Sequence, residues 1–299
     1  MIQELRSSGP DLIGAIGSHR HDGIQGDTLL MRVKLCNMPP FHPVANQVVS
    51  MSGGPQPDVA RIASIIGGDP ALAAEVLFLA NSSLFGFPAR IRSLGHAVCL
   101  LGVDRIRDLA ITVAIRVLMR SAKRLMRPCW RHSVACAMIA EEISPLFGGL
   151  TEQAYTAGLL HDIGRLSFLK SYAAEADAVL SASYSSVEEV LSAERAALNV
   201  DHGTAGSWLV QYWDLPAAFG EICEHHHEPL HENDSQDLQI IKTACRLADV
   251  MGFSAVQYRP APRYEDVLLA LPASISLDAL PREAYLRDKI EARLKGLDV

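Results

Sequence analysis

Apolar residues recur at helical spacing along most of this chain. The clearest stripe lies in residues 72–80. It follows Asp69-Pro70, where an aspartate suited to cap a helix precedes a proline suited to the first helical position. No segment alternates between apolar and polar residues as a half-buried strand would, and no fixed-period repeat is visible. The pattern therefore predicts an all-α fold.

The same periodicity, with its caps and its Gly and Pro breaks, divides the chain into a series of helices. We expect them at residues 28–36, 44–51, 57–67, 69–81, 96–101, 105–123, 130–147, 151–162, 166–180, 186–198, 202–213, 215–228, 238–251, 264–271 and 281–296. A break near Pro128 separates two lobes. The predicted organisation is a tail at 1–26, an N-terminal helical lobe at 27–122, a second helical lobe at 123–258 and a helical extension at 259–299. The last helix is strongly charged, which favours a solvated helix over a surface for association.

Charge is unevenly distributed. The net charge of -7 argues against a general nucleic-acid-binding protein, whose surface would be basic. Between Asp104 and Arg131, however, eight basic and two acidic residues give a local charge of +6. Residues 105–123 are predicted to form one apolar and one basic helix face, and Arg116, Arg120 and Arg124 are candidates for binding an acidic partner or a phosphate. The alternative is a solvated face paired with the protein's own acids.

The six cysteines form no C-x-x-C pair, and several lie in apolar runs. They are typical of small buried hydrophobic residues in a reducing compartment. The N-terminus lacks the pattern of a signal peptide, and the most apolar windows are too short to span a bilayer. We therefore expect a cytoplasmic protein without a membrane partner.

Candidate chemistry centres on His161-Asp162, which follows an apolar helical run at 155–160. Thr151 is suited to cap this helix, and Gly164 is predicted to stop it through a left-handed conformation. An imidazole nitrogen and a carboxylate oxygen would then be presented together where a helix ends.

Further histidines and acids lie near the ends of other predicted helices. The candidate metal ligands are His132, His161, Asp162, His202, His226, His227 and Asp249. Imidazoles mixed with carboxylates suit zinc, iron, manganese or nickel, in a mononuclear or a binuclear site. Each residue also has an ordinary structural explanation: His132 could be a core histidine, His202 could follow a cap at Asp201, and Asp249 could pair with Arg246 or Lys242. Three consecutive histidines cannot all face one site, so His225 is expected outside it.

The order of these residues resembles that of the HD phosphohydrolase superfamily, and His202 with the run His226-His227-Glu228 is similar to its HD-GYP branch, which hydrolyses cyclic di-GMP. The N-terminal half resembles the HDOD family, the HD-related output domain. The matching segments are Met38-Pro39-Pro40, Gly68 to Ala74, Leu79 to Ser82, Ile91 to Leu94, Ala97 to Gly102 and Trp130 to Ser133. The resemblance extends over residues 28–251.

The resemblance implies an N-terminal helical lobe packed on an HD-like lobe, and a role in bacterial signalling, generally without demonstrated catalysis. It places HD-type metal positions on His132, His161, Asp162 and Asp249, and HD-GYP-type positions on His202, His226 and His227. The chain also departs from the HD-GYP pattern. Pro128 stands where those enzymes have a glutamate, Arg165 replaces a lysine, and no Gly-Tyr-Pro follows His227-Glu228.

Three functions fit these residues. The first is a non-catalytic signalling protein that acts through a protein partner or a nucleotide and keeps a metal-ligand pocket. The second is a metal-dependent phosphohydrolase for a cyclic dinucleotide or another nucleotide, with Asp162 and Arg165 in catalysis and Arg165 as a phosphate clamp. The missing glutamate counts against this enzyme, because a two-metal site needs bridging negative charge. The third is a sensor that binds a cyclic dinucleotide without cleaving it.

Overall fold

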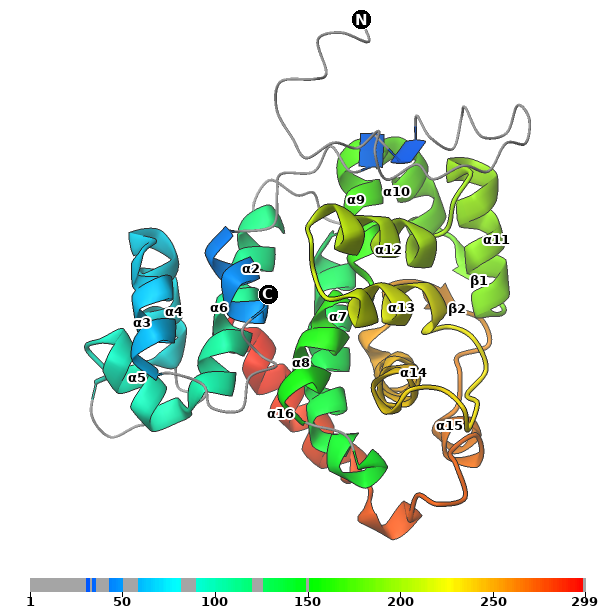
Figure 1. The fold of residues 1–299 in the computed structure, drawn as a ribbon. Coiled ribbons are helices and arrows are strands. Elements are labelled where there is room, and N and C mark those ends of the chain that lie inside the picture. Colours follow the sequence, from blue (N-terminus) through cyan, green and yellow to red (C-terminus); the bar gives the residue numbers. More distant parts are fainter. Residues whose placement is uncertain are drawn as a thin grey trace, which may run out of the picture.

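The computed structural model describes residues 31–32, 34–35, 43–50, 59–81, 90–119, 126–148 and 151–297. These residues form two helical lobes that share one hydrophobic core (Figure 1). The all-α prediction, with an N-terminal lobe packed against a second helical lobe, is confirmed. The predicted tail at 1–26, the segment Met38-Pro39-Pro40, Arg120 and Arg124 lie outside the described residues.

The N-terminal lobe is built from short helices with local caps. It comprises α2 (Pro43–Ser50), α3 (Val59–Gly67), α4 (Pro70–Ala80), α5 (Leu94–Leu101) and α6 (Val103–Met119). As the sequence predicts, the Asp69 side chain caps α4, where its Oδ1 accepts from the amides of Ala71 and Leu72 at 2.9 Å. The Ser93 hydroxyl caps α5 in the same way. The apolar stripe of α4 packs against α6, which links the two lobes.

Helix α6 differs from the amphipathic helix that was predicted. Residues 106–115 are buried on every face, including Arg107 and Asp108. Arg107 is neutralised locally, because its guanidinium lies 3.2 Å from Asp104 Oδ1 and 3.6 Å from Asp108 Oδ1. Burial raises the pKa of Asp108 to about 7, against the influence of Arg107. The prediction of a basic face along this part of the helix is therefore wrong.

The second lobe carries the candidate ligands. It comprises α7 (Met126–Ile143), η3 (Ser144–Phe147), α8 (Thr151–Leu160), α9 (Ile163–Ser171), α10 (Ala173–Ser181), α11 (Val187–Leu198), α12 (His202–Tyr212), α13 (Ala217–His225), α14 (Gln236–Ala248) and η4 (Asp249–Phe253). Helix α7 begins at Met126, four residues before the predicted start. Pro128 falls in its first turn, where a proline costs no helical hydrogen bond.

Two glycines allow helices of this lobe to approach closely. At Gly158 in α8, an added Cβ would lie 2.6 Å from Cα of Ala137 in α7. At Gly164 it would lie 1.9 Å from the carbonyl oxygen of His202 at the start of α12. Gly164 does not stop a helix as predicted, since it lies in the first turn of α9. Its role is to let α9 cross α12, which brings Asp162 next to His202.

Two short strands and the packing of the last helix were not predicted from the pattern. Two-residue strands β1 (Ser183–Tyr184) and β2 (Gln257–Tyr258) pair in parallel. The extension after β2 comprises α15 (Tyr264–Leu269), η5 (Leu277–Ala279) and α16 (Glu283–Gly296). Helix α16 lies along α7 and buries Leu286, Ile290 and Leu294 (Figure 1). It is therefore part of the core, although a solvated charged helix was expected.

The core runs without interruption from the N-terminal lobe through the second lobe to α16. Four cysteines, at 129, 136, 223 and 245, are buried as expected, whereas Cys99 is exposed. Within the described ranges, no single helix has the length and apolarity to cross a membrane, and α3 with α4 passes that test only as a pair bent by 120°.

Candidate metal centre

Four segments of the second lobe bring six candidate ligands together in its interior. Helix α7 carries His132, and α8 ends at His161-Asp162. The start of α12 supplies His202, and the end of α13 supplies His226 and His227. His132, His161, Asp162, His202 and His226 are each at most 3% exposed, and His227 is half-buried. His225 points away and pairs with Glu228 at the surface.

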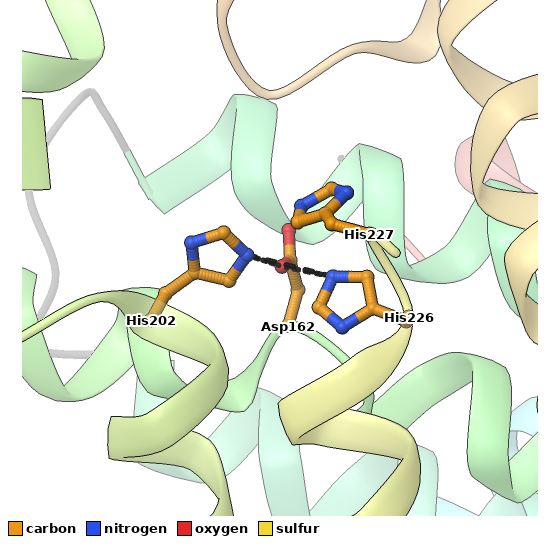
Figure 2. A group of neighbouring side chains, drawn as sticks. All are labelled: Asp162, His202, His226 and His227. Carbon is orange, nitrogen blue, oxygen red and sulfur yellow. Dashed lines mark hydrogen bonds and ion pairs between the residues drawn. The ribbon is translucent and has the colours of Figure 1, made fainter. Parts of the chain in front are cut away.

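The first group of donors consists of Asp162, His202, His226 and His227, which face one another in Figure 2. Each offers one atom, and the four atoms lie within 4.8 Å of one another. Asp162 Oδ1 is 3.1 Å from His202 Nε2 and 3.5 Å from His226 Nε2, and the two Nε2 atoms are 3.4 Å apart. This is a compact set of three imidazoles and one carboxylate.

A second group of donors adjoins the first and consists of His132, His161 and Cys245. His132 Nε2 lies 3.2 Å from His161 Nε2 and 3.5 Å from Cys245 Sγ. Asp162 connects the two groups, since its second oxygen, Oδ2, is 3.8 Å from His132 Nε2. Asp249 lies on the other side of the His132 ring, with Oδ1 3.5 Å from Nδ1.

The histidines are oriented by partners behind them. The Nδ1–H of His161 donates to the Gly158 carbonyl at 2.6 Å, and that of His226 donates to the Cys223 carbonyl at 2.8 Å. His202 Nδ1 donates to Glu194 Oε2 at 2.6 Å, and His132 Nδ1 faces the Phe253 carbonyl at 3.1 Å. Because carbonyl and carboxylate oxygens only accept, Nδ1 carries the proton in each ring and Nε2 points inward. Histidines that bind metals in proteins are held in this way.

Unsatisfied atoms support the fit of a metal ion to this centre. Among the described residues, both carboxylate oxygens of Asp162 and Nε2 of His227 are buried without a hydrogen-bond partner. Asp162 has two cationic neighbours, with Arg165 Nε 2.9 Å from Oδ2 and His202 Nε2 3.1 Å from Oδ1. Buried polar atoms are rarely left unpaired, and a cation among these atoms would satisfy them. The His/Asp cluster can therefore hold a metal.

Two residues around the cluster complete its charge balance. Arg165, on α9, lies with Nε 2.9 Å from Asp162 Oδ2 and with Nη1 3.8 Å from Glu194 Oε1. Both Arg165 and Glu194 are buried. The sequence did not single out Glu194, since it is one of several acids on α11 and only the fold brings it behind His202. Arg165 had been proposed to clamp a phosphate, yet here its guanidinium contacts the protein's own carboxylates.

These neighbours shift the pKa values of the buried groups. Burial opposes the ionisation of Asp162, but Arg165 and His202 outweigh it and hold its pKa well below the usual range. Burial and Arg165 lower the pKa of His202, but Glu194 and Asp162 raise it to about 9 overall. Burial lowers the pKa of His161 and His227 well below the usual value, and that of His226 below it. Asp162, Glu194, Arg165 and protonated His202 thus form a neutral set, in which a metal would displace the His202 Nε2 proton.

The cluster is reached from a surface cleft of about 780 Å³. Its lining includes Cys245, Asp249 and His227 of the second lobe, together with Tyr258, Pro260 and Val267. Of the other residues proposed for binding a partner or a phosphate, Arg116 is half-buried and lies 3.4 Å from Glu75. It lies on α6, outside this cleft.

Comparisons with known proteins identify a matching family model and structures with a similar fold. A family model described as the HDOD domain matches residues 38–229. The structure is similar to that of an HDOD domain protein of unknown function from Geobacter sulfurreducens, with 23% identity, a TM-score of 0.69 and coverage of 91% of this chain and 95% of that one. It is also similar to a provisionally assigned phosphohydrolase from Shewanella amazonensis SB2B, with 22% identity, a TM-score of 0.64 and coverage of 92% and 96%. At these identities the likeness shows the fold alone.

One curated relative also matches, an uncharacterized protein of Treponema pallidum (strain Nichols). It is 24% identical over 185 residues, which are 59% of this chain and 35% of the relative. The match therefore spans about a third of that protein's length.

Proposed function

The chain belongs to the HDOD family, and from that premise we propose that it is a non-catalytic module of bacterial signal transduction. In this proposal the second lobe holds a divalent metal, and the output is binding to a protein partner. The metal would be held by Asp162, His202, His226 and His227, with His132 and His161 beside them. When bound, it supplies a cross-link between the ends of α8, α12 and α13.

The position of Arg165 is the observation that carries this proposal. Phosphate hydrolysis needs a positive group free to hold the phosphate and a metal position open to it. The guanidinium of Arg165 is 3% exposed and is directed onto Asp162 and Glu194. The side chain most suited to bind a phosphate therefore neutralises the centre itself, which favours a structural or regulatory site over hydrolysis.

A second function is favoured by the cleft. A volume of about 780 Å³, with His227 and Asp249 on its wall, is large enough for a small-molecule ligand and reaches the cluster. A metal-dependent phosphodiesterase for a cyclic dinucleotide would use this route. The same cleft would serve a sensor that binds such a ligand without cleaving it.

The test measures metal content and turnover on the same preparations. The purified chain, the variant His202→Gln and the control His225→Gln would be analysed by mass spectrometry for zinc, iron, manganese and nickel. Each would then be incubated with cyclic di-GMP. His225 is the matched control because it is adjacent to the cluster but exposed. We expect metal in the wild type and the control, a loss of about tenfold or more in His202→Gln, and no linear product from any protein.

Each other outcome points to a different function. Linear product that disappears with His202→Gln would establish the phosphodiesterase and overturn the proposal. Calorimetric binding of cyclic di-GMP without turnover would replace the protein partner with the dinucleotide. A folded wild type that takes up none of the four metals would refute the metal centre.

A further inference from the structure

The half of the centre formed by His132, His161 and Cys245 contains a sulfur atom that the family resemblance does not assign. Cys245 lies on α14, one turn before Asp249, and is 1% exposed. Its Sγ lies 3.5 Å from His132 Nε2, and His132 Nε2 lies 3.2 Å from His161 Nε2. Three helices therefore bring two imidazole nitrogens and one sulfur together.

The distances match the edges of a tetrahedral zinc site. Zinc binds nitrogen at about 2.0–2.1 Å and sulfur at about 2.3 Å, so tetrahedral ligands lie about 3.3 Å apart for two nitrogens and about 3.6 Å apart for nitrogen and sulfur. The observed values of 3.2 and 3.5 Å agree with both edges. The third pair, His161 Nε2 and Cys245 Sγ, lies within 4.8 Å.

Without a metal, hydrogen bonds within this group cannot satisfy both imidazole Nε2 atoms. His161 and His132 both direct Nδ1 to oxygen acceptors, so their two Nε2 atoms are acceptors that face each other. The single thiol proton of Cys245 can satisfy only one of them. The other needs a cation or an added proton, and Asp162 Oδ2, which also faces Arg165 Nε, is 3.8 Å from His132 Nε2.

Asp249 occupies a different place from that of a ligand in this half. Its Oδ1 approaches Nδ1 of His132, the ring nitrogen that points away from His161 and Cys245. A carboxylate there fixes the ring and increases the basicity of Nε2. Asp249 therefore positions His132, and Cys245 stands where the third donor is required.

We propose that Cys245 is a metal ligand and that His132, His161 and Cys245 bind zinc as a half-site of this centre. The inference rests on the proposed function only in that the chain holds a metal at all. The thiol releases its proton to solvent as the sulfur–metal bond forms. Asp162 Oδ2 is the nearest carboxylate oxygen to complete the coordination. A thiolate ligand selects zinc over manganese, which prefers oxygen donors.

X-ray absorption spectroscopy on the full chain loaded with zinc tests the proposal directly. We expect a zinc–sulfur shell at about 2.3 Å in the wild type. The shell should be lost in Cys245→Ser and kept in Asp249→Asn. Cys223→Ser is the matched control, because Cys223 is also buried on a helix of this lobe but its Sγ contacts the Leu160 carbonyl. Cobalt substitution should give a sulfur-to-cobalt charge-transfer band with the same dependence on the variants.

The outcomes separate this inference from the proposed function. Bound zinc without a sulfur shell in the wild type would overturn the assignment of Cys245 and leave the metal-holding module intact. A shell lost in Cys223→Ser but kept in Cys245→Ser would also overturn it. Absence of zinc from the folded wild type would refute the metal centre itself. The wild-type spectrum decides the question even if Cys245→Ser fails to fold.

Discussion

The two lobes are built from similar helices but bury different chemistry. In the N-terminal lobe, α3 and α4 bury aliphatic side chains such as Ile62, Ile66, Leu72 and Val76. The second lobe also buries His161, Asp162, Arg165, Glu194 and His202. Aliphatic burial stabilises a fold in any ordinary buffer, whereas buried charges are stable only while each keeps its partner. The second lobe should therefore depend on pH, on metal and on single atoms in ways that α3 and α4 of the N-terminal lobe do not.

The largest expected difference comes from two glycine substitutions, one in each lobe. Gly164→Ala should destabilise the protein by more than about 5 kcal/mol, because its Cβ would overlap the His202 backbone and neither helix has a flexible side chain to move. Gly95→Ala in α5 meets nothing within 4 Å and should stabilise the helix by about 0.5–1 kcal/mol. Urea denaturation measures both. Similar midpoints for the two variants would show that the α9–α12 crossing is not tight.

Removing one charge from each lobe should give the next largest difference in stability between the lobes. Glu194→Gln is isosteric, but it leaves buried Arg165 and His202 with Asp162 as their one remaining carboxylate partner and should cost about 3–5 kcal/mol. Glu75→Gln weakens the half-buried pair with Arg116 and should cost less than about 1 kcal/mol. Thermal unfolding of the metal-free proteins compares them. Equal losses would contradict the view that the second lobe depends on its charge pairs.

The smallest predicted effect is a loss of stability of the second lobe as pH rises from 7 to 9. Because the pKa of His202 is raised to about 9, its stabilising charge is complete below about pH 6.5 and is lost as pH rises to 9. In metal-free protein we expect a loss of order 2 kcal/mol between pH 7 and 9. Asp108, whose pKa is about 7, changes mainly below this window.

At acidic pH, stability should fall as the pH decreases. Since the pKa values of His161, His226 and His227 are lowered, the unfolded chain takes up protons first and stability falls as pH drops below about 6.5. Hydrogen exchange, corrected for its intrinsic pH dependence, should show both losses in α12 before α4. If the protection of α12 from hydrogen exchange does not change between pH 7 and 9, His202 is neutral throughout that range.

The contrast between the lobes also explains what the sequence could predict. Local signals were sufficient where a cap is visible in the sequence: Asp69 caps α4, as Asp69-Pro70 predicts. The prediction for α6 failed because charged residues such as Arg107 and Asp108 are usually exposed, whereas here Arg107 is buried beside both Asp104 and Asp108. The role of Gly164 was predicted wrongly because the close contact that requires a glycine is made with the backbone of α12, which is distant in the sequence.

For the same reason, the sequence predicts some residues of the candidate centre but not others. The adjacent His161-Asp162 and the histidine run can be read along the chain, and the fold brings them together with His132 and His202. Glu194 and Cys245 carry no local signal, since an acid on a charged helix and a cysteine in an apolar run are ordinary. Their positions behind His202 and beside His132 depend on how α11 and α14 pack.

The packing of α16 along α7 has a consequence for how the protein is made. Helix α7, which carries His132, ends at Ile143, whereas α16 begins at Glu283. A ribosome therefore releases the ligand-bearing helix long before it has synthesised the one that covers it with Leu286, Ile290 and Leu294. During that interval the nascent chain exposes an apolar strip on α7. A chaperone that recognises exposed apolar helix surfaces would be able to bind α7 until α16 is synthesised and covers it.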